Sequence, residues 1–296
     1  MFEQLLLGHL LGCDTELSQH LARWNDEMAI FIQEAPPDTD EGWGKGSQYG
    51  RIVFSVNMQD NAERIVSGIL TVDVICQSGL QDPSEMENIV KPLIDGYFFT
   101  GTNHTIAAQW SASNYFTDPT KEEDGVTIAF SLIAFPVQAS CEPDPIQLLN
   151  RYTKEIIPNS CVIGLDNITT VWKPSNTVPA IYWRLVDISP CSWIPSTYAC
   201  EWQTALCQAH ILAPDKEIET ITSRTLDNGF SFKKSLCFSD GTYMRVDRNI
   251  RINPGADALK QGQVSLEATY GILRDYSSEK LKEIHISDRL TSEGGN

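Results

Sequence analysis

The stretch SGILTVDVICQSGLQDPSEMENIVKPLIDGYF, residues 67–98, joins a strand pattern to a helix pattern and decides the class of fold. Residues 69–76 alternate between two faces, one of them wholly apolar, which predicts a strand with one buried side. That buried side consists of Leu70, Val72, Val74 and Cys76. Apolar residues then recur at helical spacing over residues 86–94, between Pro83 and Gly96. A proline before and a glycine after such a run are typical of helix ends.

The same order of elements occurs twice along the chain. Residues 29–137 read as short strand, proline-rich loop, two strands, helix and two more strands, and residues 168–274 repeat that order. The opening short strand is read as AIFIQ in the first half and as TTVW, residues 169–172, in the second. Val126 and Val264, which both begin the closing strand, are 138 residues apart. A repeated order at a near-constant offset predicts a duplicated domain.

The predicted fold class is therefore α+β, with two tandem copies of a small domain whose mostly antiparallel sheet is packed by helices. We assign residues 1–137 to the first copy, 138–145 to a linker and 146–275 to a second, diverged copy. Residues 276–296 are predicted to form a C-terminal helix and a tail. Few residues are identical between the halves, so two unrelated small α+β domains stay open as the alternative.

The N-terminal segment is predicted to be helical. The apolar run LLLGHLLG, residues 5–12, is well short of the roughly 20 residues that span a bilayer, and no basic segment precedes it. We therefore expect a buried helix and no membrane partner. Leu17, Leu21, Trp24 and Met28 follow at spacings of 4, 3 and 4 residues, which predicts a further helical face.

Composition indicates globular domains with an acidic surface. The chain has 296 residues, 39 Asp and Glu against 22 Lys and Arg, and a net charge of −17. A length near 300 residues favours about two domains. The negative charge opposes binding to nucleic acid or to anionic membranes by charge alone. The eight cysteines are scattered without a CxxC motif, which is typical of free thiols in a reducing compartment.

No catalytic or metal-binding signature is present in the sequence. GWGKGSQYG, residues 42–50, is glycine-rich but matches no phosphate-binding motif and precedes a strand. Cys207 and His210 lie three residues apart, so on one strand they point to opposite faces and do not converge on one ion. We therefore predict no catalytic residue, no cofactor and no metal, and a chain that is not an enzyme.

Long loops and irregular strands supply candidate contact residues instead. The loop at residues 35–50 and the loop at residues 190–200 both carry aromatic residues, a type enriched in interface cores. The segment at residues 243–253 carries three arginines. The candidate interface residues are Trp43, Tyr49, Trp193, Arg245, Arg248 and Arg251; the open alternative is that the aromatic residues cover the ends of the cores and the arginines are solvated.

The order of elements in each half resembles the tail terminator, or tail completion, proteins of tailed bacteriophages. The segments that carry the resemblance are IFIQEAPP (30–37), ILTVDVICQSG (69–79) with the helix from Ser84, and VTIAFSLIAFPV (126–137). The second half carries it more loosely, in ALCQAHILAPD (205–215) and VSLEATYGILR (264–274). Members of that family contain one such domain, so the tandem arrangement is a departure that leaves the stoichiometry of the ring open.

The resemblance implies a structural virion protein, made in the bacterial cytoplasm, that forms a ring at the tail and neck. Such a ring terminates the tail tube and joins it to the head. The implied partners are other copies of the chain, the tail tube protein and a head-completion or neck protein. DNA passes through the lumen without sequence-specific contact. We expect a hexamer rather than a trimer, because the second copy has diverged in its loops.

Two alternatives stay open from the sequence. The first is a tail tube protein with a duplicated domain, which shares the same pattern. The second is a carbohydrate-binding or receptor-binding β-rich module. That module requires exposed aromatic residues on one face, for which Trp43, Trp110 and Trp193 are the candidates.

Overall fold

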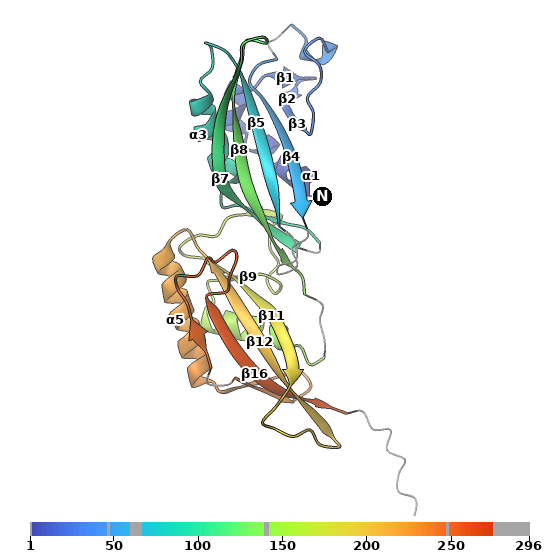
Figure 1. The fold of residues 1–296 in the computed structure, drawn as a ribbon, viewed down its shortest axis with the longest axis vertical. Coiled ribbons are helices and arrows are strands. Elements are labelled where there is room, and N and C mark those ends of the chain that lie inside the picture. Colours follow the sequence, from blue (N-terminus) through green and yellow to red (C-terminus); the bar gives the residue numbers. More distant parts are fainter. Residues whose placement is uncertain are drawn as a thin grey trace, which may run out of the picture.

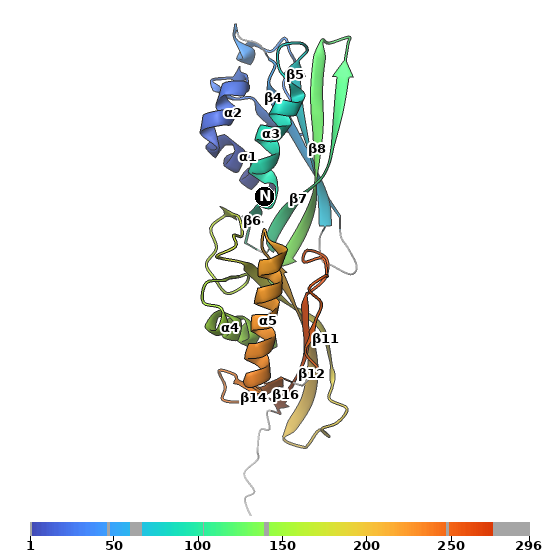
Figure 2. The ribbon, with the colours of Figure 1, turned by 90° about the vertical axis from the view of Figure 1, so that its left-hand side faces the viewer.

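The computed structural model describes residues 2–45, 48–59, 67–102, 104–138, 142–246 and 249–274. Two domains lie end to end along the long axis of the molecule (Figure 1). Each contains one curled, mostly antiparallel sheet with helices packed against it (Figure 2). The predicted α+β class with two tandem sheets is confirmed.

The first sheet has the strand order β10-β6-β7-β8-β5-β4-β3. Its neighbouring strands are antiparallel except for β3 and β4, which are parallel. The elements of this half are α1 (Phe2–Gly12), α2 (Asp14–His20), β1 (Arg23–Trp24), β2 (Glu27–Met28), β3 (Ile30–Ile32), η1 (Glu41–Trp43), β4 (Arg51–Gln59), β5 (Ser67–Gln77), α3 (Pro83–Ile94), β6 (Phe98–Thr100), β7 (His104–Asp118) and β8 (Glu123–Pro136).

The second sheet has the order β13-β14-β16-β12-β11-β9, with β15 also paired to β16. Here β9 and β11 are the parallel pair. The elements of this half are α4 (Pro145–Ile156), β9 (Cys161–Val162), β10 (Val171–Trp172), β11 (Ala180–Pro190), β12 (Cys200–Leu212), α5 (Lys216–Phe232), β13 (Ser235–Cys237), β14 (Tyr243–Val246), β15 (Arg251–Ile252) and β16 (Val264–Leu273).

The two sheets have the same connectivity. Reading across each sheet, β3-β4-β5-β8-β7-β6 corresponds to β9-β11-β12-β16-β14-β13. In both, a helix precedes a short strand that is parallel to the next strand. In chain order, a second helix then separates the third of these six strands from the fourth, β5 from β6 and β12 from β13. This is the connectivity that a duplicated domain requires.

Each domain has its own core between one sheet face and its helices. The predicted buried face of β5, Leu70 to Cys76, is fully buried against α1 and α3. The second core is centred on Trp183, whose indole Nε1 donates to Thr153 Oγ1 at 2.8 Å. No helix among the described residues is long and apolar enough to cross a membrane.

Two sequence predictions are wrong. The helical face through Trp24 and Met28 is not formed, because α2 ends at His20 and Leu21 is extended. Asn25 and Asp26 have positive φ angles and make the turn between β1 and β2. The TTVW segment does not open the second sheet either. It forms β10, which pairs with β6 of the first sheet, and β9 takes the place expected for it.

Candidate functional site

A third apolar cluster joins the two domains. It contains Phe98 and Phe135 from the first sheet and Tyr182 and Leu212 from the second. Trp172 of β10 stacks on Phe98 with ring centroids 4.7 Å apart. The second half therefore reaches across the junction and adds a strand to the edge of the first sheet.

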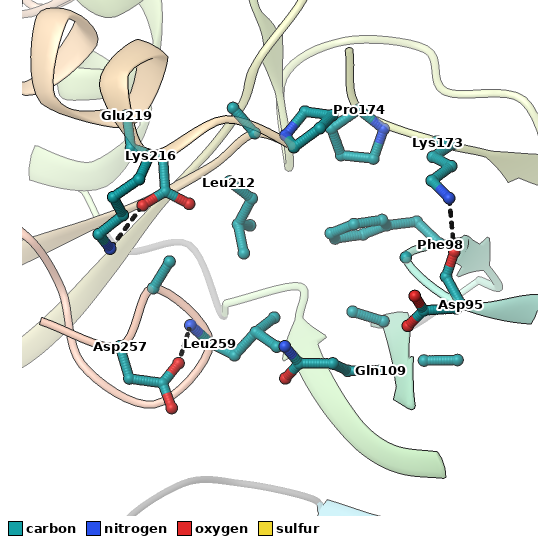
Figure 3. A pocket seen from close by; sticks show the side chains of 16 residues that line it. Asp95, Phe98, Gln109, Lys173, Pro174, Leu212, Lys216, Glu219, Asp257 and Leu259 are labelled. Atoms are coloured by element: carbon teal, nitrogen blue, oxygen red, sulfur yellow. Dashed lines mark hydrogen bonds and ion pairs between the residues drawn. The ribbon is translucent and has the colours of Figure 1, made fainter. Parts of the chain in front are cut away.

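A cavity of about 450 Å³ lies at this junction (Figure 3). Phe98, Leu212 and Leu259 form apolar parts of its wall, and charged residues from both domains surround them. Cavities of this size between domains are common places for small ligands. The sixteen lining residues include no serine, threonine, cysteine, histidine or tyrosine, and their ionisable side chains are lysines and carboxylates.

The charged groups of the cavity have partners within the protein. Lys173 Nζ donates to the backbone oxygen of Asp95 at 2.6 Å. Lys216 Nζ pairs with Glu219 Oε2 at 2.7 Å. Asp257 Oδ1 accepts from the backbone N–H of Leu259 at 3.0 Å. These contacts connect the charged groups of the cavity wall to neighbouring residues of the same protein.

Cys207 and His210 lie on opposite faces of β12, as the alternation predicts. Cys207 faces the second core, and burial raises the pKa of its thiol to about 12. His210 Nδ1 is 2.8 Å from the backbone oxygen of Ala258 on the other face. No cluster of three or more potential metal ligands occurs within the described ranges. The seven described cysteines are free thiols, and Cys141 lies outside those ranges.

Two of the predicted contact residues come together at the far end of the second domain. The Arg245 guanidinium carbon lies 5.5 Å from the ring centroid of Trp193, although 52 residues separate them in sequence. Trp193 is 51% exposed. Arg251 is exposed on β15, and Arg248 lies outside the described residues.

Trp43 and Tyr49 lie at the opposite end of the molecule, where Trp43 is buried and Tyr49 is half-buried. Trp43 is only 6% exposed, and its Nε1 donates to the backbone oxygen of Pro37 at 3.0 Å. Tyr49 donates its hydroxyl to the backbone oxygen of Lys121 at 2.9 Å. In this conformation Trp43 is buried against Phe31 and is not available to a partner. The six candidates therefore do not form one surface.

The open edges of the first sheet are a feature that the sequence reading missed. On β7, β6 pairs only with residues 105–107, and the Asp95 carboxylate accepts from the N–H of Trp110 at 2.8 Å. On β4, β3 pairs only as far as Phe54. Among the described residues, no strand covers residues 111–117 of β7 (the β7 edge) or 55–59 of β4 (the β4 edge).

Neither edge carries the charged residues or prolines that commonly prevent strand addition. Their sequences, SASNYFT and SVNMQ, contain no charged residue and no proline. Natural proteins commonly protect edges with lysine, proline or short strands. The sequence shows that these strand segments are long and uncharged. It does not show that they lie at an edge, because that depends on the order of strands in the sheet.

In the second sheet, the edge of β11, which corresponds to the β4 edge, is blocked. The Gln138 side chain lies beside β11, where its Nε2 donates to the oxygen of Trp183 at 2.5 Å. Its Oε1 accepts from the N–H of Leu185 at 2.7 Å. One side-chain amide thus occupies the position of a neighbouring strand. β11 then ends at Pro190, which has no N–H to offer.

Comparison with known proteins gives no assignment. No protein-family model matches the chain. No curated protein matches it either.

Proposed function

We propose that this chain is a structural virion protein that forms a ring terminating a phage tail tube and joining it to the head or neck. The observation that carries the proposal is the pair of open, uncharged edges on opposite sides of the first sheet. An open edge is a template for pairing with another chain. Two different edges on one molecule make a heterologous contact, which forms a ring when its rotation closes.

The directions of the strands suit such a contact. The path from β4 through β5 and β8 to β7 takes three antiparallel steps, so β4 and β7 run in opposite directions. When copies repeat around a ring, the β7 edge of one copy meets the β4 edge of the next. Their pairing continues the antiparallel sheet without reversing either molecule.

The backbone groups set the register of this contact. On β4 the backbone groups that point away from β5 belong to Ile52 and Phe54. The N–H of Ile52 donates to the oxygen of Ala29, and the oxygen of Phe54 accepts from the N–H of Gln33. Alternation then places the next outward groups at Val56 and Met58. On β7 the irregularity between Trp110 and Ala112 shifts the alternation by one residue.

The β7 edge consequently directs its free groups outward at Ser113 and Tyr115. A register that places Tyr115 opposite Val56 and Asn114 opposite Asn57 of the neighbouring copy matches both the outward backbone groups and the side-chain faces.

This register has the stagger of a closed barrel. Within one copy, Tyr115 pairs with Val126, Val126 pairs with Val74, and Val74 pairs with Ile52, so Tyr115 and Ile52 lie at the same height across the sheet. Pairing Tyr115 with Val56 of a neighbour displaces that neighbour by four residues, or about 13 Å. Each copy contributes four strand spacings of about 4.8 Å to the ring, three within its sheet and one at the contact, so the strands tilt by about 35°. Closed barrels have tilts of about 35–45°.

The blocked edges of the second domain favour six chains over three. A ring of three chains with both copies in equivalent places needs the same edges on each copy. In the second domain, β14 has only four residues where β7 has fifteen, and Gln138 occupies the edge of β11. Lateral contact through the first domain alone is the arrangement that these edges support.

The remaining partners follow from the same proposal. A ring in the tail and neck of a virion contacts the tail tube protein below and a head-completion protein above. A net charge of −17 suits a lumen through which DNA slides without adhering. A duplicated-domain tube protein uses the same lateral geometry and is the alternative.

The carbohydrate-binding alternative has less support. Trp43 is buried, while Trp110 and Trp193 belong to different domains. The three indoles therefore do not share a face.

A charge pair at Asn57 and Asn114 tests the ring. Both side chains are exposed and lie on the helix-free face of the sheet. We expect the unmodified protein to form rings with six times the 33.0 kDa chain mass in native mass spectrometry and negative-stain images. The N57K/N114K variant should not form the ring, because like charges face each other at every lateral contact.

The N57K/N114D variant is the matched control and should keep the ring, because the same positions then carry opposite charges. Unmodified protein that stays monomeric at high concentration, or an N57K/N114K variant that still forms rings, contradicts the proposal.

A further inference from the structure

The far end of the second domain carries an exposed aromatic and arginine surface. We name it the Trp193 surface, and it consists of Trp193, Tyr198, Tyr243, Arg245 and Leu273. The exposed fractions are 51% for Trp193, 78% for Tyr198, 61% for Tyr243 and 64% for Leu273. Tryptophan, tyrosine and arginine are the residues most enriched at binding hot spots.

Backbone hydrogen bonds hold this surface in shape. The N–H of Cys191 donates to the oxygen of Trp202 at 2.9 Å, and that of Thr197 donates to the oxygen of Cys200 at 2.8 Å. Beside Leu273, the N–H of Arg274 donates to the oxygen of Ala199 at 3.0 Å. The loop that carries Trp193 and Tyr198 is thus anchored at both ends and to β16. Anchors that are already ordered lose little conformational entropy when a partner binds.

The opposite end of the molecule carries the complementary chemistry. The turn between β7 and β8 and the loop before α3 meet there, since the N–H of Ser78 donates to the oxygen of Glu122 at 3.0 Å. Leu80 is 74% exposed at this end. We name this region the carboxylate tip, and its other members are Asp82, Asp118, Glu122 and Asp124.

The tip is acidic as well as apolar. Lys121 is the only basic residue in its two segments, residues 78–85 and 118–124. Hydrogen bonds from Thr120 lower the pKa of Asp118, and hydrogen bonds from Ser78 and Thr117 lower the pKa of Asp124. The tip therefore remains negatively charged at neutral pH.

We propose that the Trp193 surface of one copy binds the carboxylate tip of a second copy. Each side offers apolar area beside a charge of opposite sign, so Leu80 has aromatic rings to pack on and Glu122 has Arg245 as a partner. The two surfaces lie at opposite ends of the long axis (Figure 2). The contact is therefore head to tail, and it leaves a free tip and a free Trp193 surface on the assembled pair.

This end contact uses none of the residues of the lateral contact. It allows one ring to stack on another, because every subunit presents one surface on each side. Stacking of rings is the property expected of a tube subunit, so the contact bears directly on the choice between terminator and tube protein.

Charge reversal in a background without rings tests the end contact alone. All variants are made in N57K/N114K, so that loss of the lateral ring cannot be mistaken for loss of the end contact. Sedimentation velocity over a range of concentrations should show chains of that background associating end to end. R245E and E122R should each weaken this association by more than about tenfold, because each leaves two like charges in contact.

The double reversal R245E/E122R restores opposite charges and should recover the association. Arg251→Glu is the matched control, because Arg251 is exposed in the same domain but outside the Trp193 surface, and it should have no effect. Salt dependence is not a criterion, since salt also screens the repulsion between two acidic chains. The proposal is overturned if the background variant shows no association, if R245E associates as its parent does, or if the double reversal does not recover.

Discussion

The two domains share one strand order and differ most at their edges. In the first domain β7 extends well past β6, and among the described residues no strand pairs with the outer side of residues 111–117, whose inner side pairs with β8. In the second domain the corresponding strand, β14, has four residues. The core pattern is thus kept while the edges change. Cores constrain a duplicated fold through packing, whereas an edge is free to gain or lose a partner.

The difference extends to what covers each edge. β10 from the second half covers β6 of the first sheet, and Gln138 from the connecting segment covers part of β11. Both additions come from chain that lies outside the repeated strands. The connecting segments therefore decide which edges are closed, and the β7 and β4 edges are the ones they leave open.

The largest expected effect on the free energy of unfolding is that of Trp183→Ala in the second core. Trp183 is fully buried and donates to Thr153. Its removal creates a cavity and leaves the threonine hydroxyl unpaired, at a cost of about 3–5 kcal/mol. Hydrogen exchange should show lost protection in β12 and retained protection in β5.

Phe54→Ala, at a fully buried position of β4, is the matched variant in the first core and should give the reverse pattern. Equal loss of protection in both sheets for either variant would show that the junction merges the domains into one cooperative unit.

A smaller effect is expected when the blocked edge is opened. Gln138→Ala leaves the oxygen of Trp183 and the N–H of Leu185 without their side-chain partner. The loss should be about 1–3 kcal/mol in the free energy of unfolding, measured by denaturant titration. The amide of Leu185 should also exchange faster.

Gln138→Glu is the control for this variant, because it keeps the acceptor for Leu185 and removes only the donor to Trp183. We expect an intermediate loss. A fully stable Gln138→Ala protein would mean that the amide does not protect this edge.

The sequence predicts the periodic elements well and the short ones poorly. The alternation in residues 67–77 and the helical spacing after Pro83 lead directly to β5 and α3. The prediction for residues 169–172 is wrong, because a two-residue strand has no periodicity and tertiary contacts determine which strand it pairs with. The Asn25–Asp26 pair was a readable turn signal that the helical spacing of its neighbours obscured.

The candidate contact residues show the same limit. Trp193 and Arg245 come together because the loop at 190–200 lies near β14, which no local pattern indicates. Trp43 is an aromatic residue in a long loop, which predicts a contact residue, yet it packs against Phe31 with ring centroids 5.8 Å apart. Residue type alone does not separate an aromatic residue that covers a core from one that awaits a partner.

The smallest effect is expected from a carboxylate that ties the extended β7 to α3, a contact for which the short β14 offers no counterpart. Glu87 accepts hydrogen bonds from the hydroxyls of Tyr115 and Ser113, and it pairs with Lys91. The hydrogen bond from Tyr115 is the largest cause that lowers the pKa of Glu87, with smaller contributions from Ser113 and Lys91. A lowered pKa means that the ionised carboxylate stabilises the fold. This contribution is complete above the ordinary glutamate pKa of about 4.3 and is lost as the pH falls through the lowered value.

The free energy of unfolding of the unmodified protein should therefore exceed that of Glu87→Gln at neutral pH, and the difference should shrink as the pH falls to about 3. Tyr115→Phe is the informative second variant. It keeps the ring on β7 but removes the hydroxyl, so the pKa of Glu87 should rise toward its ordinary value, the contribution should be smaller, and its loss should be complete at a higher pH. The measurement is a set of denaturant titrations across this pH range, together with the carboxyl titration of Glu87 followed by NMR. A difference between the unmodified protein and Glu87→Gln that stays constant over the whole range would show that Glu87 acts through packing and not through its charge. In that case α3 holds the β7 extension by shape alone, and the edge proposed for assembly would keep its position in acid.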